Sequence, residues 1–325
     1  MRTLLVASPG GHLDELRIMA DLLEVDTHDA VWVTGRNAQT ESLLSGEQVI
    51  WIPRVGSGQM AKAALGLPRA LRIQQRVRPE LLVSTGALFS TPHLLAATLR
   101  RCETWFIDSA TRVKGPSSTG RFAQHMTRAR LFVQGEGWGD PAWTSVPGVF
   151  DAFEASSRAA ESEPVLATAV VSLGTELWPF DRAIAAALRV LDGFEVTWQT
   201  GTTRATGHDG RPLDQWLPAT ELHSAFGAAD VVITHAGVGS VLAVLEQGKV
   251  PVILARRARA GEMVDDHQVE FASMIERLGL AIVAEPEELS PTHLTAAAAL
   301  SAHRRPVGTR VRPAAQPAQI PLPRR

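Results

Sequence analysis

The sequence predicts an α/β protein with two Rossmann-like domains, and three observations support this prediction. The chain has 325 residues, which is long enough for roughly two ordinary domains. Short β-branched runs alternate with turns containing Gly, Ser or Pro and with helical patterns, which is typical of βαβ units around a parallel sheet. A small polar stretch, Glu154–Pro164, divides these runs into two groups. We therefore expect domains over residues 1–155 and 165–300, with a linker boundary near residue 160.

The β-branched runs give the expected strands of each domain. Those of the first domain are Leu4–Ser8, Ala30–Thr34, Val49–Pro53, Leu81–Thr85, Thr104–Asp108 and Arg130–Gln134. Those of the second domain are Ala169–Leu173, Phe194–Gln199, Asp230–Thr234, Pro251–Ala255 and Ala281–Ala284. Residues 303–325 are rich in Arg and Pro and contain no acid, so we expect a disordered tail there, solvated or weakly attracted to anionic lipid headgroups.

Composition excludes several classes of protein. Apolar residues make up 45% of the chain and charged residues 20%, which favours a folded body over a disordered chain. The formal net charge of −2 gives no electrostatic sign of nucleic-acid binding. Cys102 is the only cysteine, so no internal disulfide can form, and a reducing compartment is expected. Every apolar run is too short for a signal peptide or a bilayer span, so we expect a cytoplasmic protein that can lie on a membrane surface.

Ligands of open α/β sheets gather at the carboxyl ends of the strands, and the first strand ends in Gly10-Gly11-His12. Paired glycines allow a sharp turn, and the helix that follows offers free N–H groups to a ligand. His12 is the candidate general base, because imidazole titrates near neutrality. The alternative is that His12 only caps the helix or contacts solvent. Asp108, at the end of another strand, is the candidate partner that orients His12, unless it caps the next segment or pairs with Arg112.

In the second domain, a glycine-rich turn follows a strand and precedes an apolar helix. Oriented N–H groups and the positive end of a helix can hold a diphosphate without a metal, and the chain contains no Asp-x-Asp pair. Two earlier strand ends and the start of a later helix, with its short acids, His and amide, offer further hydrogen-bonding groups. The candidate donor-binding residues are Gly174, Thr175, Gln199, Gly201, His235, Ala236, Gly237, Gly239, Ser240, Glu246, Asp266, His267 and Gln268. No metal site is expected, because Asp265, Asp266 and His267 in immediate succession cannot share one helical face.

These motifs resemble a known family. The segment from His235 to Gln268 is similar to the nucleotide-sugar-binding domain of the glycosyltransferases that include the peptidoglycan N-acetylglucosaminyltransferase. It is more similar still to the catalytic subunit of the two-subunit dolichol-diphosphate N-acetylglucosaminyltransferase, in its bacterial exopolysaccharide branch. The first half resembles the acceptor-binding partner subunit of that enzyme, in segments at Ser8–His12, Asp108–Val113 and Ser118–Arg121. The resemblance covers roughly residues 1–290, as a natural fusion of the two subunits.

The resemblance implies a GT-B fold, in which the two domains face each other across a cleft. It implies an inverting glycosyltransferase that needs no metal and no cofactor, with a UDP-sugar as co-substrate and a polyprenyl-diphosphate-linked saccharide as acceptor. Gly10, Gly11, Arg112 and Thr119 would lie on the acceptor side. The chain departs from the family at Ala243, where an acid usually holds the ribose, and Glu246 is the candidate substitute. It also has Asp108 in place of Glu, and Asp265 in place of Asn.

The segment Gly56–Pro79 combines basic and apolar residues without an acid, which is typical of an amphipathic helix at an anionic membrane surface. The alternative is an ordinary helix packed on the sheet with a solvated basic face. Together these features predict a peripheral enzyme on the inner face of the cell membrane. Two alternative functions remain open: a UDP-sugar epimerase, which shares this architecture, and a non-catalytic nucleotide-sugar-binding or scaffold protein, which the missing acid at Ala243 suggests.

Overall fold

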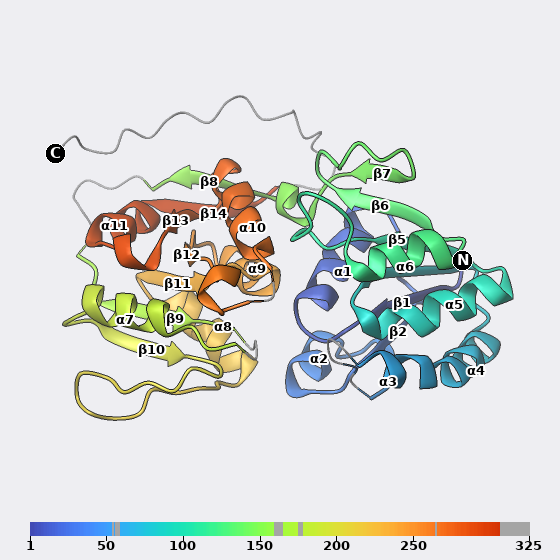
Figure 1. The fold of residues 1–325 in the computed structure, drawn as a ribbon, viewed down its shortest axis with the longest axis horizontal. Helices are drawn as coiled ribbons and strands as arrows, with labels where there is room; N and C mark the ends of the chain where they lie inside the picture. The colour runs from blue at the N-terminus through green and yellow to red at the C-terminus, as the bar shows by residue number, and fades with distance from the viewer. Residues whose placement is uncertain (54, 56–58, 159–164, 175–177, 264, 306–325) are drawn as a thin grey trace. The chain divides into compact units, whose positions relative to one another are not determined.

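The protein is described from a computed structural model, which covers residues 1–53, 55, 59–158, 165–174, 178–263 and 265–305. The chain forms two compact units, one built on residues 1–149 and the other on most of residues 150–305 (Figure 1). Each unit contains a parallel sheet with helices against it. No helix in these ranges is long and apolar enough to span a bilayer.

The first unit contains a seven-stranded sheet, counted over its described residues, in the order β3-β2-β1-β4-β5-β6-β7. All of its neighbouring strands are parallel. Its strands are β1 (Thr3–Ala7), β2 (Val31–Thr34), β3 (Gln48–Trp51), β4 (Leu81–Gly86), β5 (Glu103–Ile107), β6 (Arg130–Gln134) and β7 (Trp143–Val146). Its helices are α1 (Gly11–Leu22), α2 (Ala38–Leu43), α3 (Met60–Leu65), α4 (Leu67–Val77), α5 (Thr91–Arg100) and α6 (Ser118–Met126).

The core of the first unit follows from its strand sequences. Strands β1, β2 and β4 are buried along their whole length, as expected for apolar runs covered on both faces. Leu4, Val6, Leu82 and Phe106 belong to one apolar cluster with side chains from the helices. The strand order reverses between β1 and β4, so the loops after these two strands lie where a doubly wound sheet binds its ligand.

The second unit contains a five-stranded parallel sheet, in the described residues, in the order β10-β9-β11-β12-β13. These strands are β9 (Thr168–Ser172), β10 (Glu195–Gln199), β11 (Val231–His235), β12 (Val252–Leu254) and β13 (Ile282–Ala284). The helices in this part of the chain are α7 (Asp181–Val190), α8 (Ala219–Ala228), α9 (Val238–Glu246), α10 (His267–Arg277) and α11 (Pro291–Ala298). Here the order reverses between β9 and β11, so the loops after those strands are the expected ligand site.

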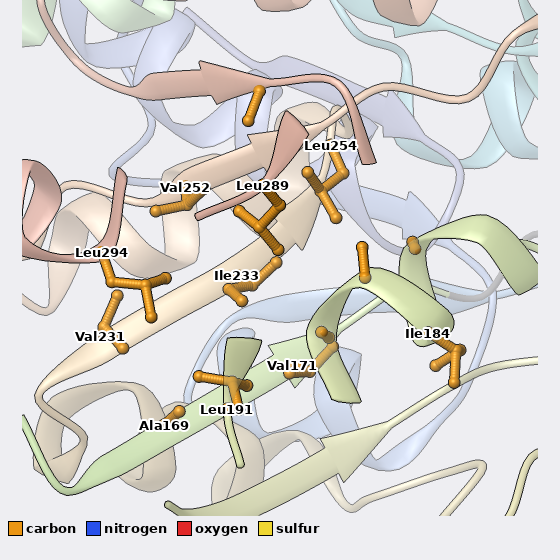
Figure 2. Close-up of a cluster of buried hydrophobic side chains, with 14 of the residues drawn as sticks. Ala169, Val171, Ile184, Leu191, Val231, Ile233, Val252, Leu254, Leu289 and Leu294 are labelled. Atoms are coloured by element: carbon orange, nitrogen blue, oxygen red, sulfur yellow. The ribbon is translucent and has the colours of Figure 1, made fainter. Parts of the chain in front are cut away.

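The core of the second unit is built from alternate side chains of its central strands. Val171 of β9, Ile233 of β11 and Leu254 of β12 are fully buried and belong to one cluster with Leu191 and Leu294 (Figure 2). The cluster is made of Val, Ile, Leu, Ala and Phe side chains, which pack without polar atoms to satisfy. This core holds β9 and β11 side by side, and so places the ends of both strands next to each other.

Every predicted strand is confirmed to within two residues, but three observed strands were not predicted. One is β7. The other two, β8 (Phe153–Ser157) and β14 (Leu300–Arg304), pair antiparallel, with Ala155 opposite Ala302. The structure therefore corrects the beginning of the expected linker and the beginning of the expected tail, which are strands. Residues 159–164 and 306–325 lie outside the described residues.

Candidate functional site

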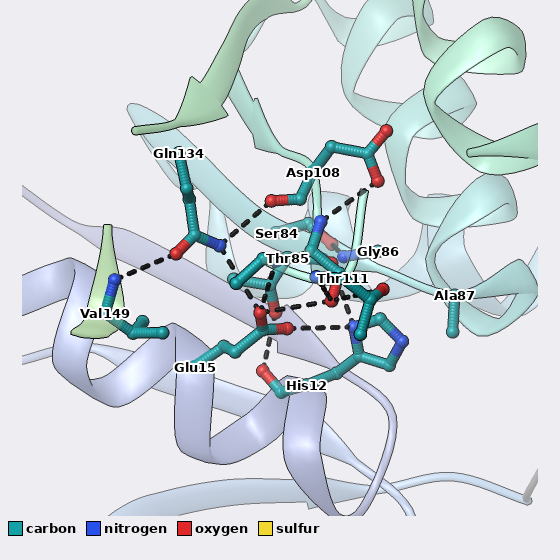
Figure 3. A network of polar contacts seen from close by, with 12 residues as sticks. His12, Glu15, Ser84, Thr85, Gly86, Ala87, Asp108, Thr111, Gln134 and Val149 are labelled. Carbon is teal, nitrogen blue, oxygen red and sulfur yellow. Dashed lines mark hydrogen bonds and ion pairs between the residues drawn. The ribbon is translucent and has the colours of Figure 1, made fainter. Parts of the chain in front are cut away.

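His12 lies in the first turn of α1, directly after the end of β1. Gly10 has a φ of +90°, a backbone conformation that favours glycine, and this turn brings His12 next to the end of β4. The Nδ1 atom of His12 lies 3.0 Å from the carbonyl oxygen of Thr85 (Figure 3). The Thr85 hydroxyl in turn donates to the His12 carbonyl at 2.6 Å. Two reciprocal contacts therefore hold His12 in place. Thr85 was not among the site residues predicted from the sequence.

These contacts decide which ring nitrogen carries the hydrogen in neutral His12. A carbonyl oxygen only accepts, so the Nδ1 atom donates to Thr85 and the Nε2 atom keeps its lone pair. The His12 side chain is 32% exposed, which leaves the ring open to a ligand. The neutral ring thus presents a hydrogen-bond acceptor at Nε2, and its role as a general base stays a prediction.

Glu15, one helical turn after His12, is the acidic residue that contacts the ring. Its Oε2 atom lies 3.5 Å from the His12 Nδ1 atom, and its side chain is only 1% exposed. Its Oε1 atom accepts hydrogen bonds from the Ser109 hydroxyl at 3.1 Å, the Ala110 N–H at 2.8 Å and the Gln134 amide at 3.3 Å. Glu15 was not predicted from the sequence, although its spacing of three residues from His12 places both on one face of α1.

Asp108 takes the alternative role expected for it, as an acceptor for the segment that leads into α6. Its carboxylate accepts from the Ser109 N–H at 3.0 Å and from the Ser117 N–H at 2.7 Å. It also fills the space beside Gly120, where an added Cβ would lie 2.4 Å from its Oδ2 atom. The expected pairing of Asp108 with His12 is corrected in this respect: the carboxylate in contact with the ring belongs to Glu15, and Asp108 shapes the loop before α6.

The two carboxylates still act on the charge of His12. Burial by itself lowers the pKa of His12, but the adjacent Glu15 and the more distant Asp108 raise it, and the net pKa lies above its ordinary value. Burial also raises the pKa of Asp108, against the opposing effect of hydrogen bonds from Ser117 and Ser109 and the charge of Arg112. An imidazole with a raised pKa is the stronger base.

The four residues predicted for the acceptor side lie in three different elements of the first unit. Gly10 and Gly11 form the turn before His12. Arg112 lies in the loop between β5 and α6, and its carbonyl accepts from the Trp138 indole at 2.8 Å. Thr119 is buried within α6, so its side chain contributes to packing there.

In the second unit, the structure brings together three of the predicted donor residues. Gly174 ends the β9 loop with a φ of +74°, and an added Cβ there would lie 2.2 Å from the Cε1 atom of His235. The ring of His235 therefore packs directly on Gly174. Gly201 also lies directly against Gly174, because an added Cβ at Gly201 would lie 2.6 Å from the Gly174 carbonyl oxygen. Thr175 lies outside the described residues.

His235 ends β11 in an environment unlike that of His12. Its side chain is only 6% exposed, and its Nδ1 atom has no hydrogen-bond partner among the described residues. Burial and the positive charge of Arg256 lower the pKa of His235 to about 3, against the opposing effect of a hydrogen bond with the Ser172 backbone. The ring is therefore neutral at physiological pH and can offer a hydrogen bond but no charge.

The turn after His235 leads into α9, and the rest of the predicted donor set lies around it. Ala236 is buried, while Gly237, Gly239 and Ser240 lie at or before the first turn of α9. Gln199 is buried and donates to the Ser172 hydroxyl at 3.1 Å. Glu246 is exposed at the far end of α9, about 9 Å along the axis from Ser240. Its suggested role as the replacement for the acid missing at Ala243 stays a prediction.

The start of α10 is held by hydrogen bonds within the protein. Asp266 accepts from the Ala258 N–H at 2.9 Å, and the buried Gln268 accepts from the Arg256 N–H at 3.2 Å. His267 contacts the carboxylate of Asp265. The Gln268 side-chain oxygen therefore already accepts a hydrogen bond within the protein, whereas Asp266 and His267 keep further hydrogen-bonding capacity, and the sugar contacts of all three residues stay predictions.

Glu262 anchors the same loop and was also missed. Its side chain is 5% exposed, and it accepts two hydrogen bonds of 2.8 Å from the guanidinium of Arg182 on α7. Its Oε2 atom also accepts from the Arg257 N–H at 3.0 Å. Paired contacts of this kind fix geometry, so Glu262 ties the loop before α10 to the start of α7. A small open pocket lies beside this pair, between α7 and Gly261.

Three comparisons with known proteins bear on this site. Residues 206–311 match the glycosyltransferase family 28 C-terminal domain. The chain is 27% identical over 322 residues to the UDP-N-acetylglucosamine--N-acetylmuramyl-(pentapeptide) pyrophosphoryl-undecaprenol N-acetylglucosamine transferase of Symbiobacterium thermophilum, covering 89% of this chain and 84% of the relative. The solved structure of Acinetobacter baumannii MurG aligns with a TM-score of 0.53 at 15% identity, over 91% of this chain and 89% of MurG.

A further solved structure, the spinosyn rhamnosyltransferase SpnG complexed with thymidine diphosphate, aligns with a TM-score of 0.57 at 16% identity. That alignment covers 92% of this chain and 94% of SpnG. The chain is a glycosyltransferase. The predicted pair of Rossmann-like domains of GT-B type is confirmed. The resemblance to the peptidoglycan enzyme is confirmed at the level of a MurG-like transferase, while the two-subunit dolichol-diphosphate family stays a prediction.

Proposed function

We propose that this glycosyltransferase moves a sugar, with inversion, from a UDP-sugar to a saccharide linked to a polyprenyl diphosphate, in cell-envelope or exopolysaccharide synthesis. The observation that carries the proposal is the His12 site, where Thr85 holds the Nδ1 hydrogen and the Nε2 lone pair stays open. The name of the Symbiobacterium relative supports the lipid-linked acceptor and the UDP-sugar. The first unit would bind the acceptor and the second unit the donor.

In the proposed reaction, the Nε2 atom of His12 takes the proton of an acceptor hydroxyl. The oxygen then attacks the anomeric carbon from the face opposite UDP, so that the new C–O bond forms as the bond to the diphosphate breaks. The anomeric configuration is inverted, the proton stays on His12, and UDP leaves with the bonding electrons. The raised pKa of His12 suits this step, because general-base catalysis improves as the base pKa approaches the working pH from below.

The second unit would stabilise the departing UDP. The N–H groups at the start of α9 and the positive end of the helix can neutralise diphosphate charge, so we propose that no metal and no cofactor are needed. His235, neutral and next to Gly174, would contribute a hydrogen bond. Transfer that stops on adding EDTA and returns with Mg²⁺ would contradict this part of the proposal.

Replacing His12 with Ala tests the base assignment. We expect turnover to fall by about 10²- to 10⁴-fold, the usual contribution of a general base, while UDP affinity measured by calorimetry stays the same. His28→Ala is the matched control, because that side chain is 89% exposed and lies outside the site. Unchanged turnover of His12→Ala would overturn the proposal, and so would accumulation of a new epimer from the UDP-sugar alone.

We also propose that α3 and α4 meet the inner face of the cell membrane. Met60 and Leu65 are 65% and 81% exposed on α3, beside the exposed Lys62. Arg69 and Arg72 are exposed on α4, and residues 59–79 contain no acid. Exposed apolar side chains among cations are typical of a surface that enters an anionic interface.

Vesicle sedimentation tests the membrane surface. We expect the protein to bind vesicles containing phosphatidylglycerol more strongly than vesicles of phosphatidylcholine alone. Replacing Met60 and Leu65 with Ser should abolish most of this binding, whereas Leu278→Ser, an exposed leucine of the second unit, should leave it unchanged. Equal binding of the double variant and the unaltered protein would contradict this surface.

A further inference from the structure

A buried acidic residue lies against the ring of His12, and the sequence motifs of the site do not include it. Glu15 is 1% exposed, which is unusual for a carboxylate unless its surroundings supply partners. Three donors converge on its Oε1 atom, from the Ser109 hydroxyl, the Ala110 N–H and the Gln134 amide. This arrangement leaves the Oε2 atom facing the Nδ1 atom of His12 at 3.5 Å.

The donors on Oε1 come from separate strand ends and fix the direction of the carboxylate. Ser109 and Ala110 follow β5, and Gln134 ends β6. The Gln134 amide also donates to the Asp108 carbonyl at 2.9 Å, and its oxygen accepts from the Val149 N–H at 2.9 Å (Figure 3). Glu15 therefore cannot turn away from His12 without breaking several hydrogen bonds.

We propose that Glu15 is the positioning residue of the proposed base: together with the Thr85 carbonyl it keeps the hydrogen of neutral His12 on Nδ1 and stabilises the imidazolium that forms when Nε2 takes a proton. This inference rests on the proposed role of His12. Both groups facing Nδ1 are acceptors, so an Nδ1 atom without hydrogen would face two oxygens at once. The charged groups that act on the ring are Glu15 on α1 and Asp108 after β5, and only Glu15 is in contact.

The replacement Glu15→Gln gives a sharp test. The Gln oxygen can replace Oε1 and accept from Ala110, and this leaves the amide NH₂ facing His12. A donor would then oppose the Nδ1 hydrogen, and the negative charge would be gone. We expect the preference for the Nδ1 hydrogen to weaken, the pKa of His12 to fall, and turnover to decrease by about 10- to 100-fold.

Nitrogen NMR of protein labelled with ¹⁵N-histidine measures the first two effects without activity. The signals of His12, one of ten histidines, are assigned by their loss in His12→Ala. In the unaltered protein we expect neutral His12 to carry its hydrogen on Nδ1, and Glu15→Gln should shift both the tautomer and the titration. Asp21→Asn, which removes a negative charge from the exposed end of α1, should change neither.

The pH dependence of kcat/KM supplies the third readout. Because loss of the Glu15 charge makes the imidazolium less stable, the acidic limb of Glu15→Gln should move to lower pH while the plateau falls. Glu15→Asp, which keeps the charge on a shorter stem, should recover part of the plateau. If Glu15 had only a structural role, Glu15→Gln would lower the amount of folded protein and leave the acidic limb of the kcat/KM profile at the same pH.

The outcomes separate this inference from the proposed function. An unchanged tautomer and titration of His12 in Glu15→Gln would overturn the role of Glu15, whatever its activity. A neutral ring with hydrogen on Nε2 in the unaltered protein would overturn it without any variant, so the test stands even if Glu15→Gln fails to fold. Full turnover of His12→Ala would overturn the proposed base instead and leave the coupling between Glu15 and His12 intact.

Discussion

His12 in the first unit and His235 in the second are both candidate site residues, and their environments give them opposite properties. His12 follows β1 and His235 ends β11, and each of these strands borders the point where the strand order of its sheet reverses. His12 is 32% exposed and contacts Glu15, and its pKa is raised. His235 is 6% exposed near Arg256, and its pKa is lowered to about 3.

The difference shows that a place beside a switch point does not set the protonation of a histidine, which depends on burial and on the neighbouring charges. A carboxylate beside His12 favours the charged form, so the ring can hold a proton that it has taken. Burial beside a guanidinium keeps His235 neutral, so the ring can only exchange hydrogen bonds. Four experiments test this difference between the two rings.

The largest expected effect comes from replacing Gly174 with Ala in the second unit. The added Cβ would lie 2.2 Å from the ring of His235, at a φ of +74° that disfavours side chains. We expect a loss of about 2–4 kcal/mol in the free energy of unfolding of this unit and the loss of UDP binding. Calorimetry with UDP and denaturant unfolding would measure both.

Gly193→Ala is the matched control for this replacement. Gly193 has a similar φ of +82°, with no atom within 4 Å of an added Cβ, so it isolates the backbone cost at about 1 kcal/mol. If the two variants were equally stable and bound UDP equally, His235 would not pack on Gly174 as described.

The next effect is a pH dependence of the free energy of unfolding. Its sign is opposite for histidines with a lowered pKa and for His12, whose pKa is raised. Burial lowers the pKa of His93 to about 4 and, with Arg256, that of His235 to about 3. Because the unfolded chain binds these protons at higher pH, each residue lowers the free energy of unfolding as pH falls below 6.5, by about 2 kcal/mol at pH 5. His12, with its raised pKa, stabilises the fold below pH 6.5, and that contribution disappears as pH rises through its folded pKa.

Urea unfolding at pH 8 and pH 5 would measure this difference. His93→Gln keeps a polar side chain that cannot titrate, so it should lose less stability than the unaltered protein between these two pH values. A larger loss for the variant would show that His93 is not held neutral.

A third, smaller effect would distinguish the role of Asp108 from that of Glu15 in the titration of His12. In Gly120→Ala, the added Cβ would lie 2.4 Å from the Asp108 carboxylate and 3.0 Å from the Trp143 ring. Overpacking costs roughly 1–3 kcal/mol, and replacing a glycine within a helix returns about 1 kcal/mol, so we expect a net loss of about 1 kcal/mol. Because the carboxylate in contact with His12 is that of Glu15, the ¹⁵N titration of His12 should stay almost unchanged. A large shift in that titration would instead return the positioning role to Asp108.

The smallest expected effect concerns the pH dependence of binding. Since His235 is neutral well above pH 3, UDP affinity should show no histidine titration from His235 between pH 5 and pH 8, whereas kcat/KM should fall at low pH as His12 takes a proton. Calorimetry at several pH values, with His235→Gln as the comparison, would detect a contribution. A steep fall in affinity near pH 6 that disappears in His235→Gln would contradict the neutral ring.

Much of the fold and part of the site could be predicted from the sequence. Strands such as β1 and β11 are local apolar runs, and the turns after them contain Gly10 and Gly237, so both switch points could be found. Glu15 was missed because an acid on an amphipathic helix usually faces solvent, and its burial depends on donors from β5 and β6. Asp108 was assigned to His12 for the same reason: the sequence shows that an acid ends a strand but does not show which hydrogen bonds it accepts.

Long-range pairing accounts for the missed strands. Phe153–Ser157 and Leu300–Arg304 are short, mostly small or polar segments without a β-branched residue, and each became a strand only through the other. Local patterns therefore indicated a linker and a tail where the chain forms an antiparallel ladder. The same limit applies to Gln268, whose burial depends on the backbone of Arg256.

The ladder of β8 and β14 has a consequence for synthesis of the protein on the ribosome. Arg158, directly after β8, donates to the Ser301 hydroxyl of β14 across a separation of 143 residues. The β8 strand therefore cannot pair with β14 until almost all of the described chain has been translated. The first unit lies earlier in the sequence and can fold while the rest is made. The second unit closes last, and a ribosome that stalls before residue 300 would leave β8 as an open strand edge, the kind of surface on which other chains pair.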